Sequence, residues 1–517
     1  MAIKKPHRYL LLQLIPLFVA IICSPGTHAN TVELDTSQGK LIGNTSATNS
    51  SISVFKGIPF AKPPAGNRRW THSELADSWE GARLATQFSP ACMQHPYPEN
   101  SFFSRPSMPS SEDCLYLNVW SGAKPEEKLP VMVWIHGGAL TRGTGATNIY
   151  DGSALASKGV VVVSINYRLD IFGYFSHPEL KLANGKPSAN FGTSDQVTAL
   201  RWVKKYIREY GGDPDNVTIF GESAGSFSVH HLMSTPGANG LFHRAIGQSG
   251  NSLQPMPDAR VANSTSNQMA LKYQAAAKAN SLTDLKQMDA ANILASAEGF
   301  RFRPVLDGTL FEDQIYALFD RGEYNSVPLM VGFNADEGTT LGVGAAVAKT
   351  QQGYKAYVNK RFGTLAEEYL SIYPADDLYR STMDAFRDGF VTWGMQTWAM
   401  KMANTDQQAY LYYFTFKPAG EKLGAYHAAE IVYAFNNLEH LTDSVPDNHK
   451  QLAEAMSDYW VAFAKSGKPN VEGLPIWLPY SKENRHYIEL DEQIQGKKDL
   501  LPGIWEFHNK VRLEQAR

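Results

Sequence analysis

The sequence FGESAGS at residues 220–226 constrains the fold more than any other part of the chain. It follows an apolar run typical of a strand, residues 216–220, and precedes an apolar segment with helical character, residues 227–233. A strand, a G-x-S-x-G turn and a helix form the sharp elbow that lifts a serine hydroxyl above a parallel sheet. The two glycines allow strand and helix to approach closely, and the helix N-terminus favours negative charge developing near Ser223. The pattern predicts an α/β chain with a nucleophilic serine.

Six short apolar runs, rich in β-branched and aromatic residues, are typical of strands buried on both faces of a parallel sheet. They span residues 130–135, 160–166, 217–220, 244–248, 329–333 and 409–416. Helical patterns lie between them; the clearest covers residues 194–210, and residues 211–214 (GGDP) are expected to end it. This alternation predicts a doubly wound α/β sheet. Residues 31–34 and 53–55 are expected to form a small antiparallel extension, and residues 258–322 and 353–405 to form helical insertions that cap the site.

The first 29 residues have the pattern of a secretory signal. Basic residues at positions 4, 5 and 8 precede an apolar run over about residues 10–22, and residues 27–29 suit a cleavage site. The apolar run is too short for a comfortable membrane span, and no later segment is apolar enough, so stable membrane insertion is not expected. A lipid anchor on Cys23 is the disfavoured alternative, because bulky Ile22 precedes it. We expect an exported protein, either periplasmic or extracellular.

Charge and cysteine content narrow the partners of the mature chain. The whole sequence has a formal charge of −3, and removal of three basic and no acidic residues with the signal leaves −6. This balance argues against a nucleic-acid partner or a polybasic membrane surface. Cys92 and Cys114 remain, and in an exported chain such a pair is most simply one disulfide. Without a neighbouring histidine pattern these cysteines do not make a zinc site, and no metal is expected.

A serine nucleophile needs a base, a group that orients the base, and donors for the oxyanion. The sequence WIHGGAL at residues 134–140 directly follows a predicted strand, and its small residues let backbone N–H groups turn towards a carbonyl oxygen. The expected donors are the N–H groups of Gly138, Ala139 and Ala224. A glycine loop that serves only close packing is the alternative.

The acid and the base are expected to follow the serine along the chain, in the order found in α/β-hydrolases. Residues 331–338, VGFNADEG, place the adjacent carboxylates of Asp336 and Glu337 at a strand end, and the pattern alone leaves open which one serves. A solvated turn is the plain alternative. Among the later histidines, His427 lies in the small-residue loop GAYHAAEI at residues 424–431. Four others lie in polar sequence and are expected at the surface: His440, His449, His486 and His508.

Taken in order, these motifs resemble the type-B carboxylesterase family, which also includes cholinesterases and some fungal and bile-salt lipases. The resemblance runs from about Phe55 to near the C-terminus. It includes FKGIPFA at 55–61, EDCLYLNV at 112–119, NYRL at 166–169, QSG at 248–250 and FAKSGKPN at 463–470. It implies an α/β-hydrolase fold with a mostly parallel central sheet, one large domain over residues 30–517, and a serine esterase that acts on small-molecule esters without a cofactor.

The resemblance also implies roles for particular residues. Ser223, Glu337 and His427 would form the catalytic triad, and Gly138, Ala139 and Ala224 would supply the oxyanion donors. Glu222 and Ser249 would support the triad. Cys92 and Cys114 would form the disulfide, and Arg69 and Glu112 an ion pair that flanks its loop.

Departures from the family pattern bear on the substrate. The loop between Cys92 and Cys114 contains no tryptophan, whereas cholinesterases place a choline-binding tryptophan there, so a choline ester is not expected. Asp170 and Ser226 stand where the family usually, or often, has glycine, and we expect only local changes in packing from them.

Two other functions remain as alternatives. One is a true lipase, with the loop between Cys92 and Cys114 acting as a lid. The other is a non-catalytic cholinesterase-like binding module, which the intact serine, glutamate and histidine argue against. The sequence leaves the natural ester and the oligomeric state open.

Overall fold

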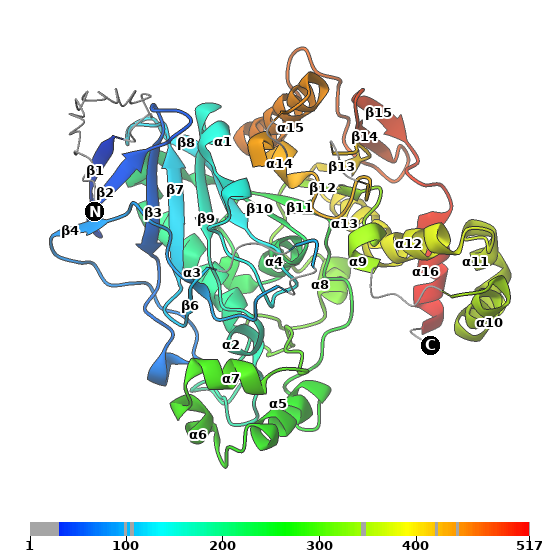
Figure 1. Cartoon of the computed structure of the whole chain (residues 1–517), viewed down its shortest axis with the longest axis horizontal. Coiled ribbons are helices and arrows are strands. Elements are labelled where there is room, and N and C mark those ends of the chain that lie inside the picture. Colours follow the sequence, from blue (N-terminus) through cyan, green and yellow to red (C-terminus); the bar gives the residue numbers. More distant parts are fainter. Residues whose placement is uncertain are drawn as a thin grey trace, which may run out of the picture.

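The computed structural model describes residues 30–97, 101–103, 108–342, 348–418, 422–440 and 444–515, so the expected signal lies outside the described residues. One mixed sheet of 13 strands crosses the molecule within these ranges (Figure 1). Its strands are β1 (Thr31–Thr36), β2 (Gly39–Thr45), β3 (Ser53–Pro59), β4 (Ala82–Leu84), β7 (Tyr116–Ser121), β8 (Leu129–Ile135), β9 (Val161–Ile165), β10 (Gly212–Glu222), β11 (Arg244–Gln248), β12 (Leu329–Asn334), β13 (Ala409–Phe414), β14 (His486–Leu490) and β15 (Gln495–Lys498). A separate pair consists of β5 (Ala91–Cys92) and β6 (Ser110–Ser111).

The strand order explains how distant residues meet. It runs β1-β2-β3-β7-β9-β8-β10-β11-β12-β13-β14-β15, with β4 beside β2. From β9 through β8 and β10 to β14 each strand is parallel to the next, and β4 is parallel to β2. The pairs β1–β2, β2–β3, β3–β7, β7–β9 and β14–β15 are antiparallel. The predicted parallel sheet with an N-terminal antiparallel extension is confirmed. The carboxyl ends of β8, β10 and β12 share one edge of the sheet, which is where open α/β sheets place their sites.

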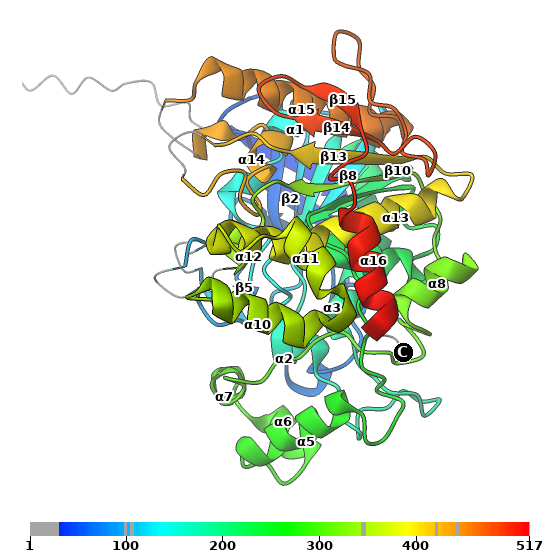
Figure 2. The ribbon, with the colours of Figure 1, turned by 90° about the vertical axis from the view of Figure 1, so that its right-hand side faces the viewer.

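Helices cover both faces of the sheet because alternate strand residues are apolar on both sides. Val131, Val133 and Ile135 belong to the core on one face, and Met132 and Trp134 to the core on the other. The first face packs against α3 (Phe191–Tyr206), α4 (Ala224–Met233) and α13 (Trp393–Ala403). The second packs against α1 (Ser153–Ser157), α14 (Ile431–Ala434) and α15 (Asp447–Ser466). Figure 2 shows α14 and α15 on one side of the sheet and α3 and α13 on the other.

The remaining helices lie mainly in the two predicted insertions. They are α2 (Asp170–Tyr174), α5 (Thr265–Ala276), α6 (Leu282–Gln287), α7 (Ala290–Ser296), α8 (Ile315–Arg321), α9 (Gly338–Leu341), α10 (Gln351–Phe362), α11 (Ala366–Ile372), α12 (Leu378–Arg387) and α16 (Ile504–Gln515). Helices α5 to α7 gather at one end of the molecule, and α10 to α12 lie beside α16 (Figure 1). One helix of the second insertion, α13, does not cap the site but packs on the sheet. Its buried residues form a stripe at helical spacing: Met395, Trp398, Ala399 and Met402. Among the described helices, none has the length and apolarity needed to cross a bilayer.

Helix α3, which precedes β10, has slightly different bounds from the range of residues 194–210 expected from the sequence. It starts at Phe191, and a 3-10 turn, Ile207–Tyr210, continues it to Gly211, whose φ of 82° ends it. Residues 212–214, expected as part of the stop, already belong to β10. Glycine at 211 is required here because a Cβ would lie 2.5 Å from the Cβ of Ala123.

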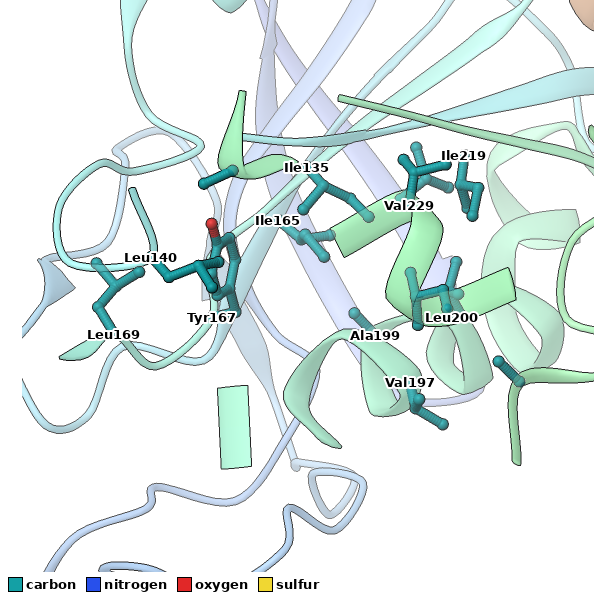
Figure 3. Packing of buried hydrophobic residues seen from close by; sticks show 14 of the residues in the cluster. Ile135, Leu140, Ile165, Tyr167, Leu169, Val197, Ala199, Leu200, Ile219 and Val229 are labelled. Atoms are coloured by element: carbon teal, nitrogen blue, oxygen red, sulfur yellow. The ribbon is translucent and has the colours of Figure 1, made fainter. Parts of the chain in front are cut away.

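Helix α4 is buried nearly all round, which fixes the elbow at its N-terminus. Figure 3 shows Val229 of α4 near Ile219 of β10, and Leu140 of the loop after β8 beside Tyr167 and Leu169. Two successive histidines, His230 and His231, are buried on this helix. The ring of His230 stacks on Trp398 with centroids 4.0 Å apart.

Substitution of His231 by glutamine is expected to make the protein more tolerant of acid. Burial lowers the pKa of His231 to about 3. Since the unfolded chain takes up this proton below about pH 6.5 and the folded chain does not, folding stability is lost as pH falls through this window. The loss amounts to roughly 2 kcal/mol between pH 7 and pH 5. Urea unfolding at both pH values should show the variant losing less stability than the wild type; equal losses would contradict this.

Candidate active site

Ser223 occupies the strained elbow between β10 and α4. Its backbone has φ 55° and ψ −120°, a conformation that costs free energy for a residue with a side chain. Its N–H donates to the carbonyl oxygen of Gln248 at 2.8 Å, which anchors the turn on β11. A Cβ on Gly225 would lie 2.0 Å from the carbonyl oxygen of Ile135, so only glycine permits this approach of helix and strand. Ser223 is half-buried, whereas the residues on either side of it are buried.

The loop after β8 lies directly against the serine. A Cβ on Gly137 would be 3.2 Å from the Cβ of Ser223. Gly138 and Ala139 both have positive φ, 106° and 58°, which turns the chain sharply at this point. In the part of the chain that the structure describes, the N–H groups of Gly138, Ala139 and Ala224 donate to no protein acceptor. They can therefore receive a negatively charged oxygen.

Glu337 and His427 meet at the carboxyl ends of β12 and β13. The Nδ1 atom of His427 lies 2.5 Å from Oε2 of Glu337 in a hydrogen bond. The other oxygen, Oε1, accepts the backbone N–H of Asn334 at 2.9 Å. Both side chains are almost fully buried. A carboxylate placed in this way holds the imidazole in one tautomer, with its Nε2 atom directed away from the acid.

The Nε2 atom of His427 faces a second carboxylate. It lies 3.0 Å from Oε1 of Glu222, the residue immediately before Ser223. No hydrogen bond joins Ser223 Oγ to His427 among the contacts of the described residues. Hydrogen bonds of this kind often form only when the substrate is bound.

A third carboxylate, Glu430, was not anticipated from the sequence. It is fully buried and accepts hydrogen bonds from Gln248 Nε2 at 3.0 Å and Asn334 Nδ2 at 2.6 Å. Its spacing of three residues after His427, in the same small-residue loop, was the available signal. The two amides satisfy its oxygens, so this carboxyl links β11, β12 and the histidine loop.

The buried carboxyls and the imidazole shift one another's pKa values. Burial raises the pKa of Glu222, and Glu430 and Glu337 add to this rise while His427 opposes it. Burial lowers the pKa of His427, but Glu222 and Glu337 outweigh burial and raise it above the ordinary value. Burial also raises the pKa of Glu430. Glu222 and His427 consequently titrate as a pair.

Substitution of Glu222 by glutamine is expected to move the acid limb of the kcat/KM profile to lower pH. The variant removes a carboxylate that stabilises the imidazolium, so the neutral base persists to lower pH, by about one pH unit. The pH dependence of ester hydrolysis measures this directly. The matched control is Glu312→Gln at an exposed position. An acid limb that stays in place would mean that Glu222 does not act on His427.

Asp336 binds the histidine loop instead of the imidazole. Its Oδ2 atom accepts the N–H of Ala425 at 2.9 Å, and its own N–H donates to the carbonyl oxygen of Ala425 at 2.9 Å. Oδ1 pairs with Arg380 of α12 at 2.7 Å. Gly424 must be glycine, since a Cβ there would lie 2.1 Å from Oδ2. Asp336 thus sets the position of the loop that carries His427.

Replacement of Asp336 by alanine is expected to lower kcat ten- to a hundredfold, because displacement of a catalytic group by about 1 Å has an effect of this size. KM should change little, since the loop positions the base and not the ester. Steady-state kinetics separates the two constants. Arg380→Ala is the comparison: its side chain is half exposed, so a much smaller effect is expected. An unchanged kcat in Asp336→Ala would contradict the assignment.

The other residues implied by the resemblance are placed as follows. Cys92 and Cys114 form a disulfide. Arg69 and Glu112 form a bidentate ion pair with distances of 2.5 and 2.6 Å. Ser249 lies at the end of β11, but its buried Oγ has no hydrogen-bond partner among the described residues. A supporting hydrogen bond from Ser249 to the triad is therefore not seen.

The segment between the two cysteines reaches the histidine. The ring of Phe103 lies 6.2 Å from that of His427, edge to face, and Phe102 packs on Tyr426 at 4.7 Å. Phe227, in the first turn of α4 after Ser223, packs edge to face on Phe390, with ring centroids 6.0 Å apart.

The expectation that the later histidines are exposed was wrong for two of them. His449 and His508 are buried, and each ring bonds a buried tyrosine hydroxyl, Tyr433 at 2.8 Å and Tyr373 at 2.9 Å. Both lie on the inner faces of amphipathic helices, whose polar outer residues dominate the local sequence. His486 is half-buried, and the side chain of His440 lies outside the described residues.

Within the described ranges, no three His, Cys, Asp or Glu side chains are arranged to hold a metal ion.

Comparison with known proteins identifies the family of the chain. Residues 30–503 match the model of the carboxylesterase family. The chain is 33% identical over 489 residues to para-nitrobenzyl esterase of Bacillus subtilis, covering 90% of this chain and 96% of the relative. It is 34% identical over 479 residues to fumonisin B1 esterase of Sphingopyxis macrogoltabida, covering 88% of each.

Solved structures agree in fold. A PNB esterase structure superposes with a TM-score of 0.79 at 32% identity, covering 92% of this chain and 99% of the other. A Geobacillus stearothermophilus carboxylesterase superposes with a TM-score of 0.80 at 32% identity, covering 93% and 99%. With a family match and relatives that each extend over most of its length, the chain belongs to the carboxylesterase family, and its reaction is the hydrolysis of carboxylic esters.

Proposed function

We propose that the protein is a serine carboxylesterase that works through an acyl-enzyme on Ser223. The observation that carries the proposal is the buried hydrogen bond between Glu337 and His427 beside the serine elbow. An acid that orients an imidazole close to an elevated serine is the arrangement that activates a hydroxyl for attack.

The reaction proceeds in two symmetrical halves. His427 Nε2 takes the proton of Ser223 as Oγ attacks the ester carbonyl carbon, and Glu337 stabilises the imidazolium. The N–H groups of Gly138, Ala139 and Ala224 bind the oxyanion of the tetrahedral intermediate. The imidazolium then gives its proton to the departing alcohol, leaving the acyl group on Ser223. Water, deprotonated by His427, repeats the sequence and releases the acid.

Glu222 tunes the base in this scheme. Its carboxyl lies next to the Nε2 atom that must accept the proton, so it favours the charged imidazole once the proton has moved.

We also propose that the protein is exported, on the evidence of the N-terminal 29 residues and the two paired cysteines. The mass of the mature protein from a secreting host tests cleavage after Ala29.

The experiment for the catalytic proposal combines covalent trapping with a substrate series. A fluorophosphonate should label the peptide that contains Ser223, with loss of activity in step with labelling. p-Nitrophenyl esters from acetyl to palmitoyl then define the acyl preference, and activity on soluble short chains is expected. Activity that rises only above the solubility limit of long-chain esters would instead favour a lipase. An unlabelled Ser223 without hydrolysis would favour a binding module.

A further inference from the structure

The side chain of Gln94 is bound to the loop that carries the proposed oxyanion donors. Its Oε1 accepts the N–H of Gly143 at 2.8 Å, and its Nε2 donates to the carbonyl oxygen of the same residue at 2.8 Å. Nε2 also donates to the carbonyl oxygen of Cys92 at 3.0 Å. Both N–H bonds and the oxygen of the amide are committed to backbone groups, so this side chain is placed to hold the loop and not to bind a substrate.

Covalent and hydrogen bonds fix the segment from which Gln94 reaches the loop. Cys92, two residues before Gln94, is joined to Cys114 by the disulfide. Asn166 donates from Nδ2 to the carbonyl oxygen of Cys114 at 3.2 Å, and its Oδ1 accepts the N–H of Gly145 at 2.9 Å. The carbonyl group of each cysteine is thus linked through one amide side chain to the end of the oxyanion loop.

A second side chain joins the same two segments. Arg142 donates from Nε to the carbonyl oxygens of His95 and Pro96, each at 3.2 Å. Its backbone N–H donates to the carbonyl oxygen of Gly138 at 3.0 Å, which closes the turn. The two segments are therefore bound together at two successive positions of the loop.

The turn that these contacts hold is strained. Ala139 and Leu140 have φ values of 58° and 61°, in the left-handed region that disfavours residues with a Cβ. Successive residues of this kind persist only where the surrounding structure holds them. Without the contacts from residues 94–96 the turn is expected to relax, and the N–H groups of Gly138 and Ala139 would move from their positions.

Gly143 transmits this restraint towards the serine through close backbone approaches. Its φ is 110°, and a Cβ on it would lie 2.4 Å from Nδ1 of His136 and 2.5 Å from the carbonyl oxygen of Gly137. A Cβ on Gly137 would in turn lie 3.2 Å from the Cβ of Ser223. Because closely packed groups transmit displacement, a shift of Gly143 changes the position of the donors relative to Ser223.

We propose that Gln94 is a positioning residue for ester hydrolysis: its paired hydrogen bonds with Gly143 hold the N–H groups of Gly138 and Ala139 where the oxyanion forms. This inference rests on the proposed function, because it concerns the oxyanion of the intermediate on Ser223. Loss of the amide weakens the binding of that oxyanion and leaves the base and the binding of the uncharged ester as they are.

The test replaces Gln94 by methionine, which keeps the length of the side chain and removes its three hydrogen bonds. The kcat for p-nitrophenyl butyrate is expected to fall about ten- to thirtyfold with little change in KM, since the donors act on the transition state. The acid limb of the pH profile should stay in place, because the substitution does not touch His427.

The chain offers a matched control in Gln314→Met. The amide of Gln314 makes the same pair of hydrogen bonds with the backbone of Met256, each at 2.8 Å, and within the described residues it makes none with the oxyanion loop. Urea unfolding should show similar losses of stability in the two variants, while Gln314→Met keeps the kcat of the wild type.

A trifluoromethyl ketone separates positioning from a general effect on structure. Ser223 Oγ adds to its carbonyl carbon, the serine proton passes to His427, and the carbonyl oxygen becomes an oxyanion held by the loop. In Gln94→Met its inhibition constant should rise by the same factor by which kcat/KM falls. The corresponding methyl ketone, which stays a ketone, should bind to wild type and variant equally.

The outcomes separate this inference from the proposed function. An unchanged kcat and inhibition constant in Gln94→Met, with Ser223 still labelled by the fluorophosphonate, would overturn the inference and leave the esterase intact. Equal kinetic losses in Gln314→Met would also overturn it, since position beside the loop would not matter. Absence of hydrolysis and of Ser223 labelling in the wild type would overturn both.

A second variant decides the matter if Gln94→Met does not fold. Arg142→Met removes the two hydrogen bonds to His95 and Pro96 and leaves the amide of Gln94 in place. Its inhibition constant for the trifluoromethyl ketone is expected to rise about threefold, because the loop keeps one of its two holds. An unchanged constant in a folded Arg142→Met protein would overturn the inference.

Discussion

Alanine in place of Ser223 is expected to lower kcat for ester hydrolysis by about a millionfold, because a nucleophile that acts in concert with its base is lost as a unit. The residual rate comes from the oxyanion donors and from binding alone. The variant should keep its fold, since the backbone and not the hydroxyl of Ser223 bonds to Gln248 and Phe227. Hydrolysis of p-nitrophenyl acetate and thermal unfolding measure the two properties.

A second variant makes this result sharper. His427→Ala and the double variant Ser223→Ala/His427→Ala should be about as slow as Ser223→Ala alone, since each removes the same concerted step. Ser234→Ala at the end of the same helix is the matched control, with a hydroxyl that bonds only its own helix. Multiplicative losses in the double variant would show that the two residues act independently, against the proposed mechanism.

Removal of Asp195 is expected to produce the largest loss of stability of any single change considered. Its carboxylate accepts three hydrogen bonds from Arg168, two from the guanidinium at 2.8 Å and one from the backbone at 3.0 Å. Both side chains are buried, 3% and 0% exposed, so Asp195→Ala leaves an arginine charge in the interior without a counter-ion. The free energy of unfolding should fall by about 3–5 kcal/mol. Urea unfolding gives the value.

Two further variants test whether the uncompensated charge of Arg168 causes the loss of stability in Asp195→Ala. Asp215→Ala breaks an exposed ion pair with Lys204 and should leave the urea midpoint unchanged. The double variant Asp195→Leu/Arg168→Met should regain much of the loss, because the isolated charge is gone. If the double variant is no more stable than Asp195→Ala, the uncompensated charge is not the cause.

The core of the fold followed from the sequence because its signals are local. The six apolar runs became strands of the parallel sheet, and the glycines of the elbow are required by contacts as short as 2.0 Å. The packing of α13 on the sheet was not predicted, although its apolar stripe is visible in the sequence, because polar residues dominate the insertion around it. His449 and His508 were predicted at the surface for the same reason.

The parts of the site that could not be predicted depend on long-range contacts. Asp336 and Arg380 are 44 residues apart, and Gln248 and Glu430 are 182 apart. No pattern in either segment indicates that strand order will bring them together. For the same reason, the approach of His427 to Glu222 emerges only in the structure.

The order of the strands also governs when the site can exist during synthesis. Ser223 directly follows β10 in the middle of the sheet, whereas His427 follows β13 and is separated from the serine by 204 positions of chain. A ribosome that has translated three quarters of the message has supplied the elbow and the proposed oxyanion loop, but not His427, the proposed base. Products that end before residue 427 are therefore expected to be inert towards esters, so a cell that makes this protein meets the hydrolytic activity only late in the synthesis of the chain.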